Sequence, residues 1–97
     1  MSYEYRVITE NKTSTIDLEL IYNNFRGCSC FNNVVLTEYG ISVPNENGNG
    51  FELVGIELIE EGFFVTANLN RKERGVVLEI IQRTMNDKGI QTIVEEE

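Results

Sequence analysis

The chain of 97 residues has the length of one ordinary domain, and 41% hydrophobic residues are enough for a single packed core. Sixteen acidic residues outnumber eight basic ones, histidine is absent, and the formal net charge is -8. This composition argues against disorder, against direct binding to nucleic acid or an anionic membrane, and against catalysis by a histidine base. We therefore expect a single domain over residues 1–97 that is not an enzyme and acts through its surface.

No apolar run approaches the about 18 residues that span a membrane, and the first six residues lack the basic and apolar regions of a signal peptide. We therefore expect a cytoplasmic protein. Its charges are unevenly placed, because the first seventy residues hold ten acids and only three bases. The other five bases fall in the last predicted helix.

The first two predicted elements are a strand over residues 3–9 and a helix over residues 14–26. In the strand, aromatic and β-branched positions alternate with charged ones. Ser14, with Asp17 three residues later, resembles a capping box that begins a helix, and Gly27 is expected to end it in a left-handed conformation. The helix has one apolar stripe, made of Leu18, Ile21, Tyr22 and Phe25.

Three further strands are predicted in the middle of the chain. Residues 31–43 alternate as one strand, which Pro44 ends because proline has no amide hydrogen to donate. Residues 45–50 form a flexible connection, and residues 51–59 and 63–69 form a hairpin. A change of apolar phase in the first arm of this hairpin predicts a bulge at Gly55.

The last predicted elements are a helix over residues 70–88 and a strand over residues 90–94. Asn70 caps this helix, and Gly89 ends it. Three terminal glutamates are expected to form a solvated tail. The buried stripe of the helix is expected to be Val77, Leu78, Ile81, Thr84 and Met85.

The predicted order of elements is therefore β-α-β-β-β-α-β. Two amphipathic helices can cover one face of a mostly antiparallel sheet, so we expect an α+β fold. Its architecture would be a two-layer sandwich of about five strands with both helices on one face. A ferredoxin-like split arrangement with an extra hairpin strand is one possible topology.

Cys28 and Cys30 are the only cysteines, and one residue separates them. A structural zinc site needs about four nitrogen or sulfur ligands, which two thiols without an imidazole do not supply. Two copies of the chain would supply four thiols at a two-fold axis. The simpler interpretation is a pair of small residues in a helix-to-strand turn. We expect no metal and no cofactor, and the sequence leaves a redox role for the two thiols open.

Carboxylates are plentiful from the second predicted strand onward. A glycosidase-type pair needs one acid in an apolar pocket, which nothing in the sequence indicates. The simplest interpretation is a solvated acidic edge, and the alternative is a surface that docks on a cationic cleft, with Tyr39 or Phe64 as an apolar anchor. The candidate partner-binding residues are Glu38, Tyr39, Glu52, Glu57, Glu60, Glu61 and Phe64, and Glu46 belongs to the same acidic set.

Arg71, Lys72 and Arg74 lie at the start of the last predicted helix. Together with backbone amides they could hold a phosphate or a carboxylate, although no glycine-rich phosphate-binding motif is present. The alternative is a solvated face with ion pairs such as Glu79 with Arg83. These three cations are a secondary candidate site, for an anion.

The leading functional hypothesis is a small acidic protein-binding domain that inhibits a basic partner such as a toxin or nuclease. In size and charge the chain is similar to bacterial toxin-immunity proteins and small nuclease inhibitors, but it holds no motif specific to them. The alternative is a homo-oligomeric α+β domain of structural or regulatory role, for example a homodimer whose exposed strands pair across a two-fold axis. An enzyme that binds an anion through Arg71 or Arg74 ranks last, because no base or nucleophile is evident.

Overall fold

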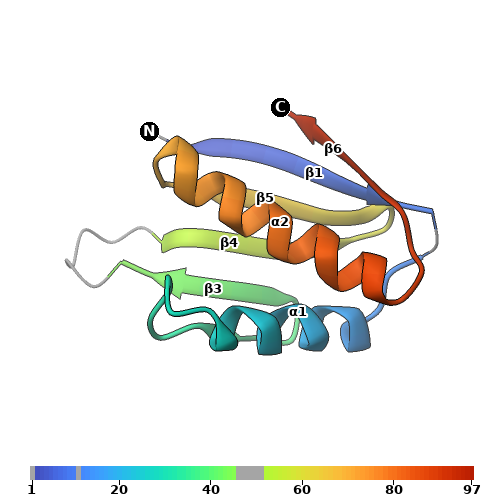
Figure 1. Ribbon diagram of the computed structural model, residues 1–97, viewed down its shortest axis with the longest axis horizontal. Helices are drawn as coiled ribbons and strands as arrows, with labels where there is room; N and C mark the ends of the chain where they lie inside the picture. The colour runs from blue at the N-terminus through green and yellow to red at the C-terminus, as the bar shows by residue number, and fades with distance from the viewer. Residues whose placement is uncertain (1, 11, 46–51) are drawn as a thin grey trace.

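Figure 1 shows the computed structural model, which describes residues 2–10, 12–45 and 52–97. The described residues form one six-stranded sheet in the order β2-β3-β4-β5-β1-β6, and neighbouring strands are antiparallel. In chain order the elements are β1 (Tyr3–Thr9), α1 (Thr15–Gly27), β2 (Val35–Leu36), β3 (Gly40–Pro44), β4 (Glu52–Ile59), β5 (Gly62–Ala67), α2 (Arg71–Asp87) and β6 (Thr92–Glu96).

Both helices pack on the same face of the sheet and share one core with it. The predicted two-layer α+β sandwich is therefore confirmed, with six strands in place of about five. β5 lies between β1 and β4, and β1 lies between β5 and β6, which is the split order of a ferredoxin-like sheet. The β2–β3 hairpin extends that sheet beyond β4, so the predicted extra hairpin strand is present as two strands.

The prediction of one strand over residues 31–43 is wrong, because a tight turn divides it into β2 and β3. The Thr37 amide donates to the Gly40 carbonyl (2.8 Å), and the Gly40 amide donates to the Thr37 hydroxyl (3.1 Å). These bonds satisfy the backbone inside the turn and end the alternation of faces. Tyr39 is consequently 74% exposed and does not share the buried face with Ile41 and Val43.

The predicted bulge lies two residues before Gly55. Two consecutive residues of β3 pair with Val54 and Glu52, so Leu53 is the extra residue of β4. Leu53 packs against the core, whereas Glu52 turns to the other face of the sheet and accepts a hydrogen bond from Ser42 (2.5 Å). A bulge at Leu53 buries an apolar side chain, which a bulge at Gly55 would not.

Two predicted ends also need correction. Gly27 is the last residue of α1 and not a left-handed cap, because extended Cys28 ends the helix and donates its amide to Phe25 O (3.1 Å). The terminal glutamates are not a free tail, since β6 runs to Glu96 and the Glu97 amide donates to Glu4 O (2.9 Å). The predicted connection over residues 45–50 lies outside the described residues except for Asn45.

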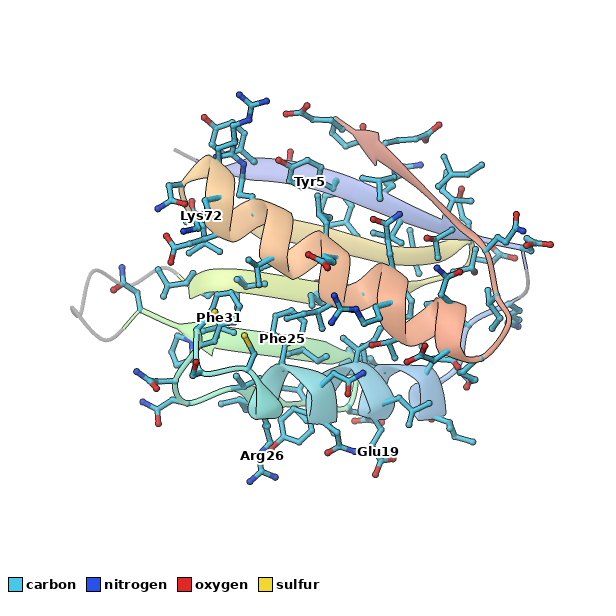
Figure 2. The ribbon with its side chains drawn as sticks, viewed as in Figure 1. Tyr5, Glu19, Phe25, Arg26, Phe31 and Lys72 are labelled. Atoms are coloured by element: carbon cyan, nitrogen blue, oxygen red, sulfur yellow. The ribbon has the colours of Figure 1, made fainter. Side chains whose placement is uncertain are left out.

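The core lies between the helix layer and the sheet. Phe25 of α1 packs against Phe31 with ring centroids 5.5 Å apart, under the helices in Figure 2. Burial of apolar surface on this scale is the main favourable contribution to folding. The largest fully buried side chains are Phe25, Phe63, Leu18, Ile21, Ile56, Ile81, Met85, Val7, Val43, Val54, Val65 and Val77.

Asp17 joins the start of α1 to the end of α2. Its side chain is 5% exposed, it accepts hydrogen bonds from the Ser14 amide (2.8 Å) and hydroxyl (3.3 Å), and it contacts the Lys88 ammonium. Burial acts to raise the pKa of this carboxyl. The hydrogen bonds and charge of Lys88 and the bonds from Ser14 together outweigh burial and hold the pKa below its usual value.

Asp17→Asn should reduce stability by about 1–2 kcal/mol at neutral pH, because the cap and the contact with Lys88 are both weakened. A carboxyl with a lowered folded pKa stabilises the fold above its unfolded pKa and loses that effect as pH falls through the folded value. The wild type should therefore lose more stability than Asp17→Asn between about pH 5 and pH 2. Urea denaturation across this pH range measures the free energy of unfolding of both proteins, with Glu19→Gln at an exposed position as the control. If the wild type and Asp17→Asn lost stability equally as pH falls, the lowered pKa of Asp17 would be contradicted.

Gly75 and Gly62 should respond to alanine in opposite directions. Gly75 lies on the exposed side of α2 with nothing within 4 Å of an added Cβ, so Gly75→Ala should stabilise by about 0.5–1 kcal/mol. At Gly62, φ is 148° and a Cβ would lie 2.0 Å from Val7 O, so Gly62→Ala should destabilise by about 1–3 kcal/mol. Chemical denaturation of both variants measures these two changes in stability. A loss of stability in Gly75→Ala would contradict the prediction.

Candidate functional site on the open face of the sheet

The strand register separates the sheet into two faces. One face meets the helices, and neither helix lies on the opposite one, which we term the open face. In each strand the residues between the buried positions point to the open face. These are Glu4, Arg6, Ile8, Ser42, Gly55, Glu57, Ile59, Phe64, Thr66, Ile93 and Glu95, together with Glu52 beyond the bulge.

The open face has an apolar row at one end. Ile8 of β1 pairs with Ile93 of β6 on one side and with Gly62 of β5 on the other, and Gly62 pairs with Ile59 of β4. Ile93 is 66% exposed. A small cavity of about 190 Å³ lies beside this row, lined by Ile8, Ile93 and the adjoining ends of β1 and β6. An apolar side chain of a partner would lose water on binding here.

The middle row combines charge with an aromatic ring. Arg6 pairs with Glu95 of β6 and with Phe64 of β5, and Phe64 in turn pairs with Glu57 of β4. Phe64 is half-buried, in contrast to Phe63, which is fully buried under the helices. Of the two adjacent rings, Phe64 is therefore the one that points away from the helices.

Arg6 is the cation at the centre of this face. Its Nη1 lies 3.8 Å from Glu61 Oε1, and its Nε lies 2.6 Å from Glu97 Oε1 as an ion pair without an aligned hydrogen bond. All three side chains are about half exposed, so these pairs contribute little to stability. The described part of the open face thus carries one guanidinium against six carboxylates, which are Glu4, Glu52, Glu57, Glu61, Glu95 and Glu97.

The predicted partner-binding residues fall in two neighbouring places. Glu52, Glu57 and Phe64 point to the open face, and Glu61 reaches it through Arg6. Glu38, Tyr39 and Glu60 instead lie in the β2–β3 and β4–β5 turns. The Leu58 amide donates to Tyr39 O (3.1 Å), which places both turns at the same end of the sheet. Glu46 lies outside the described residues.

The sequence interpretation missed Glu4, Arg6, Glu95 and Glu97. The alternation in residues 3–9 already placed Glu4 and Arg6 on one face of a strand, which was a usable signal. Glu95 and Glu97 could not be assigned in this way, because only the pairing of β6 with β1 brings them beside Arg6.

The predicted anion site at the start of α2 is divided. Arg74 turns inward: its guanidinium lies 3.6 Å over the Tyr3 ring, its Nε donates to Tyr5 Oη (3.0 Å), and its Nη1 donates to Leu69 O (2.9 Å). Arg71 and Lys72 are exposed. Arg71 and Arg74 line a broad, open depression together with Glu73, whose negative charge opposes an anion there.

Other sites offer less chemistry. Within residues 2–10, 12–45 and 52–97, no group of three or more cysteine and acidic side chains is placed to hold a metal ion. A groove of about 390 Å³ between the helices is lined by Cys28, Val76 and Ile80, with Arg83 at its rim in contact with Glu79. None of the described helices is both long and apolar enough to span a membrane.

No protein-family model matches the chain, and no match was found among curated proteins or solved structures. The support for the candidate site therefore comes from its geometry alone.

Arg74→Ala should destabilise the fold by about 1–3 kcal/mol, because the Tyr5 hydroxyl and the Leu69 carbonyl lose a charged donor. Arg74→Lys should restore little, since an ammonium does not reproduce the planar guanidinium that lies on Tyr3 and donates in two directions. Arg71→Ala and Lys72→Ala should stay within about 0.5 kcal/mol of the wild type. Denaturant titration of the four variants tests this, and equal effects at positions 71 and 74 would count against Arg74 as an anchor.

Proposed function

We propose that this protein is a small, non-catalytic cytoplasmic binding protein that docks its open face on a basic surface of another protein. An inhibitor or immunity-type protein that covers the cationic site of a toxin or nuclease acts in this way. The observation that carries the proposal is the segregation of charge: among the described residues, carboxylates from β1, β4 and β6 share one face with Arg6 as its guanidinium.

Three of the five cations of α2 and its C-cap do not neutralise that face, because they contact other side chains on the helix side of the sheet. Arg74 bonds to Tyr5, Arg83 contacts Glu79, and Lys88 contacts Asp17. A concentrated negative field on one side of a small protein steers a positive partner toward that side and accelerates encounter. Exposed carboxylates alone give little affinity, so the apolar row and the Phe64 ring would supply the desolvated centre of the interface.

The size of the open face suits such an interface. The molecule measures 37 × 25 × 22 Å, and Figure 1, drawn down the shortest axis, shows the sheet extended across the two longer dimensions. A standard protein–protein interface covers about 800 Å² on each partner, which a face of this extent can provide.

A homodimer is the alternative occupant, and exposed Val35 and Ile93 favour it. Charge argues against it, since two open faces would place carboxylates opposite carboxylates. Both sheet edges also resist pairing: β2 has only two residues, and β6 ends in consecutive glutamates. A basic partner is therefore the better fit.

Charge neutralisation on each side of the molecule tests the proposal. The open-face variant combines Glu4→Gln, Glu57→Gln and Glu95→Gln. The matched helix-layer control combines Glu19→Gln, Glu79→Gln and Asp87→Asn, which removes the same charge elsewhere. Immobilised wild type and control should retain a basic protein from a cell extract at low salt, and the purified partner should bind the open-face variant about tenfold or more weakly.

The association rate of the partner with the wild type should fall as salt is raised, because about 0.1 M salt already screens exposed charges beyond about 10 Å. Light scattering measured on the same samples shows whether the open face instead binds a second copy of the chain. A captured partner that is neutral or acidic, equal loss in both triple variants, or a salt-independent homodimer would each refute the proposal.

A further inference from the structure

The two cysteines lie in a turn that is fastened at both ends. Cys28 caps α1 and donates its amide to Phe25 O (3.1 Å), and Ser29 and Cys30 form the turn that follows. On the far side, buried Phe31 packs its ring on that of Phe25 (5.5 Å between centroids). Both ends of the turn are thus held by the same helical residue, which limits how far Cys28 and Cys30 can separate.

The two thiols are partners of each other. Neither is in a disulfide, a hydrogen bond joins their side chains, and they differ in access, since Cys30 is exposed and Cys28 is half-buried. A disulfide needs Cα atoms about 4.4–6.8 Å apart, a range that a tight turn provides for residues two apart in sequence. The turn therefore presents a reduced pair of neighbouring side chains, one exposed and one half-buried.

We propose that Cys28 and Cys30 form a dithiol site that reacts with small-molecule disulfides, such as glutathione disulfide, and closes to an intramolecular disulfide. The exposed Cys30 thiolate attacks one sulfur of glutathione disulfide, forms a mixed disulfide and releases one glutathione. The Cys28 thiolate then attacks the Cys30 sulfur, closes the Cys28–Cys30 bond and releases the second glutathione. Two electrons pass from the protein to the small disulfide, and the two thiol protons end on the two released glutathione molecules.

The surroundings of Cys30 set the rate of the first step. The interaction with the Cys28 side chain is the largest cause that raises the pKa of the Cys30 thiol, the Glu73 carboxylate adds to this rise, and the Lys72 ammonium opposes it. Cys30 therefore remains a thiol at neutral pH, and its attack should accelerate as pH is raised. This behaviour fits a site that equilibrates with the thiol–disulfide pool and not an activated catalytic cysteine.

The site is separate from the docking surface. Cys28 lines the groove between the helices and Cys30 lies near α2, whereas the open face is on the other side of the sheet. Oxidation can therefore be tested without a partner protein, and its outcome does not depend on the proposed function.

The test incubates the reduced protein of 97 residues with about millimolar glutathione disulfide. This concentration is similar to the effective concentration of a second thiol on a short tether. Mass spectrometry and thiol alkylation follow the products. The wild type should lose the mass of two hydrogen atoms and both alkylatable thiols, and dithiothreitol should restore them. Cys28→Ser should stop at a mixed disulfide with one glutathione on Cys30, and Cys30→Ser should react more slowly because Cys28 is half-buried.

The wild-type measurement decides the question even where a variant folds poorly, and circular dichroism reports that folding. A wild type that accumulates one or two stable glutathione adducts, forms disulfide-linked dimers, or keeps both thiols under these conditions would overturn the proposal. The expected pattern is that the wild type forms the Cys28–Cys30 disulfide, whereas Cys28→Ser stops at the mixed disulfide.

Discussion

The structure depends on one constraint: two helices cover one face of the sheet and leave the other to water. The strands under the helices therefore present apolar side chains to them, while most of the charged side chains of the sheet lie on the opposite side. β1 shows this most simply, because Tyr5 and Val7 are buried while Glu4 and Arg6 point to the open face. The core and the candidate binding surface are two results of the same alternation.

The helix layer is held in place by polar contacts as well as by the core. Arg74 ties the start of α2 to β1 through Tyr5, and Asp17 with Lys88 ties the end of α2 to the start of α1. Between them, Asn24 of α1 donates to the Thr84 hydroxyl of α2 (2.7 Å). The contacts of Arg74 and Lys88 pair two cations of α2 and its C-cap with groups on the helix side of the sheet. The acidic open face is therefore left without a matching set of bases, although the chain contains eight.

Local patterns predicted the elements that are set by local chemistry. The alternation in β1 and the cap and apolar stripe of α2 gave bounds within one residue of the observed Tyr3–Thr9 and Arg71–Asp87. The errors arose where distant residues decide the outcome. The bulge at Leu53 depends on pairing between β3 and β4, and the strand at Glu95 depends on β1. The turn before Gly40 is the exception, because its hydrogen bonds join Thr37 and Gly40 themselves. The hydrophobic periodicity of one segment does not show which strand it pairs with.

The candidate site was predictable in part for the same reason. The carboxylates Glu52 and Glu57 and the aromatic Phe64 were identified from the sequence of the hairpin alone. The structure adds Glu4, Glu95 and Glu97, which belong to the first and last strands and meet only because β6 pairs with β1. A surface made from segments 90 residues apart in sequence is defined by topology, so charge counting could suggest its existence but not its members.

The open face contains repulsion between carboxylates, which packing of the core does not require. Carboxylates on neighbouring antiparallel strands repel each other, and Arg6 is the cation that the structure places among them. Lysine at position 57 would relieve this repulsion without disturbing a buried residue, since the Glu57 side chain is exposed and its neighbour on β5 is Phe64. Folding alone therefore gives no reason for the acidic surface. The cationic partner that we propose would provide one, because it would remove the repulsion on binding and be attracted by the same carboxylates.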